Sequence, residues 1–192
     1  MIQPVSNQYV HEIQNPSIIS LFDVGAMQKE LNRMVDLTLL ATKVKIEDSP
    51  VFTAIWRALP FMEDIVSLLN MPPFLSLELP HIDGLGSKGK SRICAINIPL
   101  YDYQVIEAYT QFWRVVGEDH LMEERKSDYN LRYLKPETCE LAYSHQMRCV
   151  SVINVREPHN ARNASAFNRQ MISFSSTLNY QDTIKALEEY RE

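Results

Sequence analysis

The chain has 192 residues, 45% of them hydrophobic and 22% charged, and its formal net charge is −5. This length suffices for one domain with a sizeable core, and the composition is typical of a soluble globular protein. The negative charge disfavours nucleic acid as a partner without excluding it, and no membrane partner is expected. No stretch is apolar for long enough to span a bilayer, and residues 1–16 lack the basic and apolar regions of a secretory signal.

The chain contains three cysteines, Cys94, Cys139 and Cys149. Their odd number and the lack of Cys-x-x-Cys spacing predict neither a disulfide framework nor a zinc ribbon. Cys94 and Cys149 lie in apolar runs, which indicates buried free thiols. A reducing, cytoplasmic location follows as the expectation, whereas the sequence contains no indication of an oligomeric state.

The first third of the chain, residues 1–73, is expected to be rich in helix. Apolar residues recur at helical spacing over residues 24–40. Ser49 followed by Pro50 is typical of a helix start, because serine caps the first turn and proline suits the first helical position. A further helix is expected over residues 60–70, ending before the two prolines that follow it.

Strand patterns dominate residues 74–176, where short apolar runs are separated by turns rich in glycine and proline. Residues 117–140 are polar and charged, and we expect them to form a solvated loop or a short helix. A last helix is expected over residues 179–190. The expected strands are 74–79, 92–100, 108–116, 141–145 paired with 148–155, and 169–175, with 44–46 as a further edge strand.

These elements predict an α+β chain with a mainly β core, a β-sandwich or jelly roll with helices packed on one sheet. We interpret residues 1–192 as one domain, in which an α-rich part (1–73) packs on a β core (74–176) and a short C-terminal helix follows (177–192). The N-terminal helices either support one sheet or offer a surface to a partner, and the sequence does not distinguish the two.

The pair His81 and Asp83 forms the first part of a candidate metal site, because residues i and i+2 of a strand point to the same face. A third ligand must come from another strand, and His159 lies just after a strand-like segment. Two imidazoles and one carboxylate form the facial triad of non-haem Fe(II) oxygenases, which leaves coordination positions open. Arg169, ten residues after His159 (169 − 159 = 10), adds a guanidinium that suits a carboxylate through two parallel hydrogen bonds.

Each part of this pattern also has a structural interpretation. With five histidines in the chain, one His-x-Asp pair is unsurprising. His159 would then hydrogen-bond a backbone group, and Arg169 would lie on the surface. The ordered combination favours the metal site, because the pair ends a strand, the lone histidine follows a second strand and the arginine opens the last. The other histidines, His11, His120 and His145, are not assigned to the metal; we expect His120 in solvent and His145 on a strand surface.

Two strings, HIDGLGSKGKSRICAINIPL and PHNARNASAFNRQMISFS, resemble the Fe(II)/2-oxoglutarate-dependent dioxygenase superfamily. The likeness is to its small hydroxylase-like members, and it covers roughly residues 74–176. It implies a double-stranded β-helix, the cupin-like form of the jelly roll, with N-terminal supporting helices. The N-terminal third carries no specific resemblance.

By this resemblance, His81, Asp83 and His159 hold Fe(II), and Arg169 pairs with the distal carboxylate of the co-substrate 2-oxoglutarate. Molecular oxygen and an unknown peptide or small molecule would be the other partners, with hydroxylation as the outcome. Met171 stands where several relatives have serine, so another donor must complete the co-substrate pocket. The candidates for this donor are Tyr101, Tyr103 and Asn97.

Two other functions remain open at this level. A non-catalytic jelly roll could keep the fold for structural or binding work, because fold alone does not determine function. A zinc or manganese enzyme of cupin type could use the same ligands. Arg156 and Arg162 flank His159 and could bind an anionic substrate, although solvated loop arginines are commoner.

Overall fold

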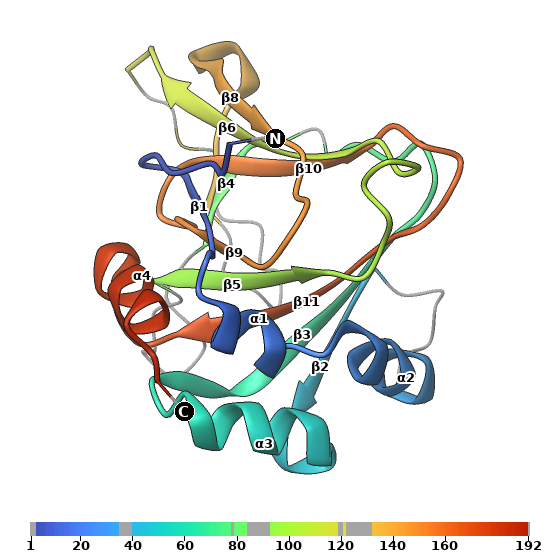
Figure 1. Ribbon diagram of the computed structural model, residues 1–192. Coiled ribbons are helices and arrows are strands. Elements are labelled where there is room, and N and C mark those ends of the chain that lie inside the picture. Colours follow the sequence, from blue (N-terminus) through green and yellow to red (C-terminus); the bar gives the residue numbers. More distant parts are fainter. Residues whose placement is uncertain are drawn as a thin grey trace.

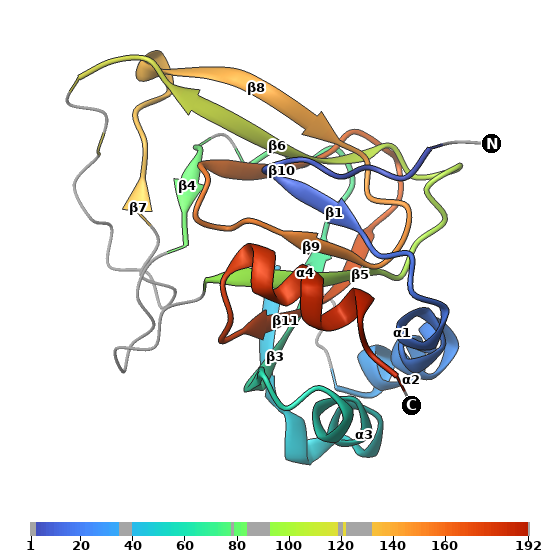
Figure 2. The same cartoon turned by 60° about the vertical axis from the view of Figure 1, so that its left-hand side comes forward.

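The computed structural model shows two antiparallel β-sheets that face each other, with helices on the outside of one of them (Figures 1 and 2). In the described part of the chain, no helix is long and apolar enough to cross a membrane. The structure describes residues 3–34, 40–77, 79–83, 93–118, 121 and 132–191.

The larger sheet has six strands, and its register is antiparallel throughout. Their order across the sheet is β1 (Val10–Glu12), β9 (Ser151–Ile153), β5 (Cys94–Pro99), β11 (Arg169–Ser176), β3 (Met62–Met71) and β2 (Ala41–Lys45). The smaller sheet has five strands, also antiparallel. Their order is β7 (Arg132–Tyr133), β4 (His81–Ile82), β10 (His159–Asn163), β6 (Ala108–Val115) and β8 (Cys139–His145).

The chain crosses repeatedly between the two sheets. β3, β5, β9 and β11 lie in the larger sheet, whereas β4, β6, β8 and β10 lie in the smaller one. Among these eight strands, every strand is followed along the chain by one from the other sheet, except that β6 is followed by β8. These two strands lie in the same sheet and pair with each other. This alternation is the winding of a jelly roll. The predicted fold class, a mainly β chain with a double-stranded β-helix and supporting α-helices, is therefore confirmed.

The helices cover the outer face of the larger sheet (Figure 2). They are α1 (Pro16–Leu21), α2 (Val24–Met34), α3 (Pro50–Ala58) and α4 (Tyr180–Glu188), with 3-10 turns at Ile46–Asp48 and Pro136–Thr138. Ser49 caps α3 as predicted, because its side chain accepts from the N–H of Phe52 and Pro50 opens the helix. Phe22 and Phe52 then pack against Phe174 of β11.

Alternation along β11 separates two cores. Ile172 and Phe174 point outward into the helix-covered core, whereas Met171 points inward between the sheets, where it joins Phe112 and other apolar side chains. Arg169 shares the inward face with Met171, because the two residues are separated by two positions. The register of β11 therefore places Arg169 inside the jelly roll.

The helix predicted over residues 60–70 is wrong, because this segment is strand β3. β3 lies between β2 and β11, and its two faces meet the two different cores. Val66 and Leu68 belong to the outer core, whereas Leu69 packs against the inner one. The apolar residues Ile65, Leu68 and Leu69 of β3 recur at helical spacing, although Ile65 is 42% exposed, and spacing alone does not separate such a strand from a helix.

The N-terminal third therefore contributes β1, β2 and β3 to the larger sheet as well as three helices, and the β core begins before residue 74. The edge strand proposed near residues 44–46 is present as β2. The helix expected over 24–40 ends at Met34, and residues 35–39 lie outside the described chain.

Other expected strands need correction. Residues 74–77 form only an isolated bridge, between Ser76 and Arg162, instead of a regular strand. The segments 141–145 and 148–155 do not pair with each other, because β8 and β9 lie in different sheets. β1, α1 and β10 were not predicted. Half of the polar segment 117–140, including His120, lies outside the described residues.

Candidate metal centre

The register of the smaller sheet brings two histidines together. β4 and β10 pair with His81 opposite His159, and the centroids of the two rings lie 4.5 Å apart. Asp83 directly follows β4, and its N–H donates to the carbonyl of Val155 at 3.2 Å. The backbone is therefore still held in place at Asp83, one residue past the end of the strand.

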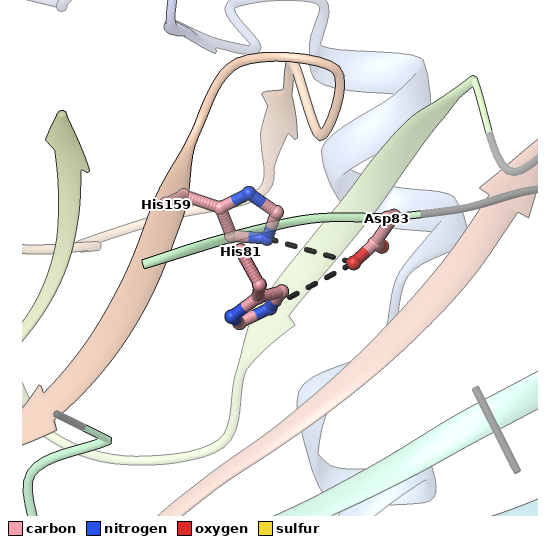
Figure 3. Close-up of side chains that lie close together, drawn as sticks. All are labelled: His81, Asp83 and His159. Atoms are coloured by element: carbon pink, nitrogen blue, oxygen red, sulfur yellow. Dashed lines mark ion pairs between the residues drawn. The ribbon is translucent and has the colours of Figure 1, made fainter. Parts of the chain in front are cut away.

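The three side chains meet around one point (Figure 3). Asp83 Oδ1 lies 3.8 Å from His81 Nε2 and 3.8 Å from His159 Nε2. One ligand atom from each residue lies within 4.8 Å of the other two. The side chains of His81, Asp83 and His159 are 11%, 8% and 12% exposed. All three residues singled out in the sequence thus converge in a nearly closed space.

The tautomer of His159 is set by its surroundings. Its Nδ1 lies 2.9 Å from the carbonyl oxygen of Glu157. A carbonyl oxygen only accepts, so Nδ1 carries the hydrogen, and in the neutral ring Nε2 presents its lone pair toward Asp83. The backbone contact anticipated for His159 is real, and it orients the ring in the way typical of histidines that bind metals.

A divalent cation fits this donor set. A neutral imidazole lone pair and a carboxylate oxygen repel each other unless a cation lies between them. Two ligand atoms bound at right angles, with bonds of about 2.1 Å, lie about 3 Å apart. The separations of 3.8 Å between Asp83 and each histidine are slightly wider than this, so small side-chain rotations would close the site on an ion.

Aromatic rings border the three ligand residues. The ring of Phe112, on β6, lies 6.2 Å from that of His159, and the ring of Tyr133, on β7, lies 6.0 Å from that of His81. Phe112 is fully buried. Such neighbours lower the local polarity and strengthen electrostatic interactions within the site.

Arg169 is 3% exposed, so the surface interpretation of this residue is wrong. Its guanidinium reaches from the larger sheet to β6 of the smaller sheet, where Nη1 donates to the carbonyl of Tyr109 (3.1 Å) and Nη2 to Oγ1 of Thr110 (2.9 Å). Its buried Nε has no hydrogen-bond partner among the described residues. Two contacts therefore hold the guanidinium in place while part of its donor edge remains uncommitted.

A small cavity of about 100 Å³ lies beside Arg169. Hydrophobic side chains form the rest of its lining, among them Leu69, Met71, Ala161 and Met171. The position of Arg169 relative to the ligand cluster follows from β10, in which His159 pairs with Phe112 and Ala161 with Thr110. The guanidinium of Arg169 therefore contacts β6 opposite Ala161, which is the next inward-facing residue of β10 after His159.

The structure also bears on the second donor of this pocket. Asn97 faces the interior but already accepts a hydrogen bond from Ser173. Tyr101 has a buried hydroxyl without a partner in the described part of the chain. Continuing the β5–β11 register, in which Pro99 pairs with Met171, would place Tyr101 opposite Arg169. Tyr101 is therefore the best supported of the three candidates.

Thr110 was missed in the sequence. It stands between Ala108 and Phe112 at an inward position of an otherwise apolar strand face, and it is 5% exposed. A lone hydroxyl at such a position is a signal for a buried polar contact. Its partner is an arginine 59 residues away, which the sequence alone does not reveal.

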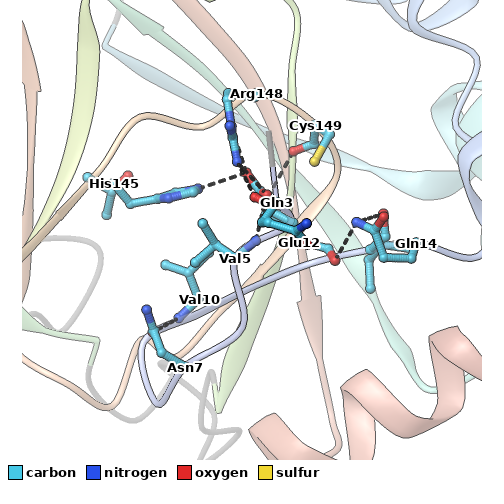
Figure 4. A network of polar contacts seen from close by, with 12 residues as sticks. Gln3, Val5, Asn7, Val10, Glu12, Gln14, His145, Arg148 and Cys149 are labelled. Atoms are coloured by element: carbon cyan, nitrogen blue, oxygen red, sulfur yellow. Dashed lines mark hydrogen bonds and ion pairs between the residues drawn. The ribbon is translucent and has the colours of Figure 1, made fainter. Parts of the chain in front are cut away.

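A second buried charged cluster lies around Glu12 of β1 (Figure 4). Arg148 donates to both carboxylate oxygens of Glu12, at 3.0 and 2.7 Å, and His145 Nε2 lies 3.8 Å from Glu12 Oε1. Burial is the main cause that lowers the pKa of His145 to about 4. The positive charges of Arg148 and Arg169 also lower this pKa, whereas the negative charge of Glu12 raises it. His145 is 3% exposed, so its expected place on a strand surface is wrong.

No known protein family and none of the curated proteins matches this chain. Solved structures with a similar course of the chain include HygX from Streptomyces hygroscopicus with iron bound (13% identity, 86% of this chain and 81% of that chain, TM-score 0.47). EvdO2 from Micromonospora carbonacea var. aurantiaca, complexed with 2-oxoglutarate, is similar at 12% identity over 88% and 86% of the chains (TM-score 0.45). Vicilin from Corylus avellana is similar at 13% identity over 92% of this chain and 31% of that chain (TM-score 0.36). Likenesses this distant carry no argument about the ligands or the reaction of this chain.

Proposed function

We propose that this chain is a non-haem, Fe(II)- and 2-oxoglutarate-dependent oxygenase that hydroxylates a peptide side chain or a small molecule. The observation that carries the proposal is the convergence of His81, Asp83 and His159 between the sheets, with the buried Arg169 on the facing sheet. The uneven cysteine count favours a reducing compartment, so we place the activity in the cytoplasm.

His81, Asp83 and His159 would hold the iron through two nitrogens and one carboxylate oxygen, which is the donor set suited to Fe(II). When bound, Fe(II) supplies the activation of molecular oxygen that couples decarboxylation of 2-oxoglutarate to oxidation of a substrate C–H bond. Three protein ligands leave coordination positions for the other reactants. A single carboxylate does not cancel the charge of a divalent ion, so the centre favours anionic ligands.

Arg169 would bind the distal carboxylate of 2-oxoglutarate. Its contacts with Tyr109 and Thr110 use one N–H of each terminal nitrogen, and three of its five N–H groups remain. The uncommitted Nε and a neighbouring terminal N–H form an edge that matches the two oxygens of a carboxylate. Because β6 already fixes the guanidinium, little conformational entropy is lost when the anion binds.

The apolar cavity beside Arg169 supports the same assignment. Its hydrophobic lining suits the two methylene carbons that separate the ends of 2-oxoglutarate. Thr110 accepts from Arg169, which leaves its own hydroxyl hydrogen to donate. Thr110 and Tyr101 are the side chains that we assign to the second carboxylate contact.

A non-catalytic jelly roll explains these features less well. A buried donor without a partner costs about 1–3 kcal/mol, and the Nε of Arg169 is such a donor within the described chain. A ligand that accepts from this atom would recover the cost. A zinc or manganese enzyme remains compatible with the three ligand residues, but it has no need for an arginine held beside an apolar cavity.

Turnover of 2-oxoglutarate tests the proposal. The purified chain, loaded anaerobically with Fe(II), should develop a weak visible charge-transfer band on addition of 2-oxoglutarate, and exposure to oxygen should produce succinate. Neither His81→Ala nor Arg169→Ala should retain succinate formation. Full activity in either variant would refute the assignment.

Metal analysis separates the competing functions. Succinate formation supported by Fe(II) but not by Zn(II) or Mn(II) is expected. A tightly bound zinc or manganese ion with no dependence on 2-oxoglutarate would favour the cupin-type enzyme. Failure to bind any divalent ion would favour the non-catalytic jelly roll.

A further inference from the structure

A groove larger than the cavity beside Arg169 lies on the outer face of the smaller sheet. The candidate metal centre lies on the opposite, inner face of the same sheet. Because alternate residues of a strand point to opposite faces, His159 and Ala161 of β10 face the interior, whereas Asn160 and Arg162 face this groove. Its volume is about 550 Å³, within the range of small-molecule and peptide sites. Its lining includes Gln111 and Trp113 of β6, Asn160 and Arg162 of β10, and the preceding segment at Phe74 and Ser76.

Two buried polar atoms at this groove lack hydrogen-bond partners among the residues that the structure describes. One is the indole N–H of Trp113, a donor, and the other is Oδ1 of Asn160, an acceptor. Asn160 is 2% exposed, and its Nδ2 donates to the carbonyl of Leu77 at 2.7 Å. This bond settles which amide atom is the nitrogen, so Oδ1 is the atom left unsatisfied.

The donor and the acceptor lie near each other on the sheet. Gln111 stands directly opposite Asn160 in the β6–β10 register, and Trp113 is two residues further along the same strand. Trp113 is thus a diagonal neighbour of Asn160, within reach of one shared ligand group. Unpaired buried polar groups are rare in folded proteins, and a complementary pair of them indicates a ligand that supplies both an acceptor and a donor.

The rim adds a positive charge and an exposed ring. Arg162 is exposed and makes no ion pair with any residue in the described ranges. Phe74 is 73% exposed, and its backbone has a φ of 55°, in the left-handed region that bulky residues avoid. Its N–H donates to the carbonyl of Ser165 at 3.1 Å, which helps to hold this strained conformation. A strained residue that displays an aromatic ring to solvent is a feature of binding sites.

We propose that this groove binds an extended acidic peptide segment. One backbone carbonyl of the peptide accepts from the Trp113 indole, and a neighbouring backbone N–H donates to Asn160 Oδ1. An acidic side chain faces Arg162, and the ring of Phe74 packs on the peptide. A neutral saccharide could satisfy the two polar atoms, but it would leave the charge of Arg162 unmatched, so the peptide is the better complement.

This binding does not require the proposed iron chemistry. The groove and the ligand cluster lie on opposite faces of β10, so a peptide can be tested on the metal-free chain. Absence of 2-oxoglutarate turnover would not contradict peptide binding in the groove. Absence of peptide binding would not contradict the metal centre. The two proposals therefore fail independently.

Indole N–H resonances give a direct measurement, because the chain has only two tryptophans. Trp56 Nε1 already donates to the carbonyl of Met62 at 3.0 Å and serves as an internal control. We expect acetyl-Ala-Glu-Ala-Glu-Ala-amide to shift the Trp113 cross-peak saturably in ¹H–¹⁵N spectra and to leave that of Trp56 in place. The Trp113→Phe variant, which lacks the donor, assigns the peak.

Charge is tested with a second peptide in which glutamine replaces glutamate. Arg162→Gln should weaken binding of the glutamate peptide about two- to fivefold, the range of an exposed ion pair, and leave the glutamine peptide unchanged. Arg114→Gln is the matched control, because Arg114 is an exposed arginine of β6 that does not line the groove. No saturable shift of Trp113 with either peptide, or a stronger response to maltotriose than to both, would overturn the proposal.

Discussion

Arg169 of the larger sheet donates to the hydroxyl of Thr110 in the smaller sheet at 2.9 Å. This hydrogen bond connects the two sheets through the interior of the jelly roll. It also fixes a guanidinium whose Nε has no partner within the described residues. The pair thus has a structural role in joining the sheets and, in the proposed function, a role in presenting Arg169 to a carboxylate.

Replacing Thr110 by valine separates these roles. Thr110→Val keeps the shape but removes the acceptor of Arg169, so a buried charged donor loses its partner. We expect the free energy of unfolding to fall by about 1–3 kcal/mol and the KM for 2-oxoglutarate to rise about tenfold, with a smaller change in kcat. Chemical denaturation and succinate assays measure the two effects. Thr110→Ser, which keeps the hydroxyl, should recover most of the KM; equal KM values in all three proteins would remove Thr110 from the co-substrate site.

Arg169 itself is expected to set co-substrate affinity. Arg169→Gln removes a charge-assisted contact of about 1.5–3 kcal/mol, which corresponds to a rise of about 10- to 100-fold in the KM for 2-oxoglutarate. The readout is succinate formation over a range of 2-oxoglutarate concentrations. Arg114→Gln, which removes an exposed arginine on β6, should leave the KM as it is. The same KM in wild type and Arg169→Gln would contradict the assignment.

The sequence predicted which candidate ligand residues lie close together better than it predicted the elements around them. His81 and Asp83 were placed together by strand alternation alone, a local rule that holds once the segment is extended. The inward direction of Arg169 follows from the same alternation along β11. His159 lies opposite His81 because two strands that are far apart in the chain pair with each other. Only the order of the motifs and the resemblance to the dioxygenase superfamily anticipated this contact.

The errors share a physical origin in tertiary context. The apolar residues of β3 recur at helical spacing, so the sequence predicts a helix where pairing with β2 and β11 makes a strand. β8 and β9 were expected to pair because they are neighbours in sequence, but a jelly roll sends them to different sheets. His145 was expected outside because its packing against β1 depends on that unpredicted strand.

Metal binding should stabilise the fold independently of catalysis. Mn²⁺, an oxygen-stable substitute for Fe(II), at about 100 times its Kd would add about 2.7 kcal/mol. For a chain of this length, we expect the Tm to rise by about 5–10 °C. His159→Ala should lose the response, because it removes one of the three ligands. His11→Ala is the control, since His11 contacts Ser6 and Glu188 away from the centre. An undiminished Tm response in His159→Ala would exclude this histidine as a ligand.

The buried His145 should make the fold sensitive to acid. Its pKa is about 4 in the folded chain, against an ordinary value of 6.5, because burial disfavours the charged imidazolium. As the pH falls below 6.5, the unfolded chain takes up this proton before the folded chain does, so folding becomes less favourable. A pKa lowered from 6.5 to about 4 corresponds to a loss of about 3 kcal/mol of stability between pH 6.5 and 4.

Urea denaturation at several pH values measures this loss, and His145→Gln isolates it. The variant lacks the titrating ring, so its free energy of unfolding should decline less steeply over the same interval, while other acidic groups affect both proteins alike. Above pH 7 the difference between the two proteins should be constant, because His145 is then neutral in the folded and the unfolded chain. Parallel decline of both proteins between pH 6.5 and 4 would show that His145 is protonated as readily in the fold as in the unfolded chain.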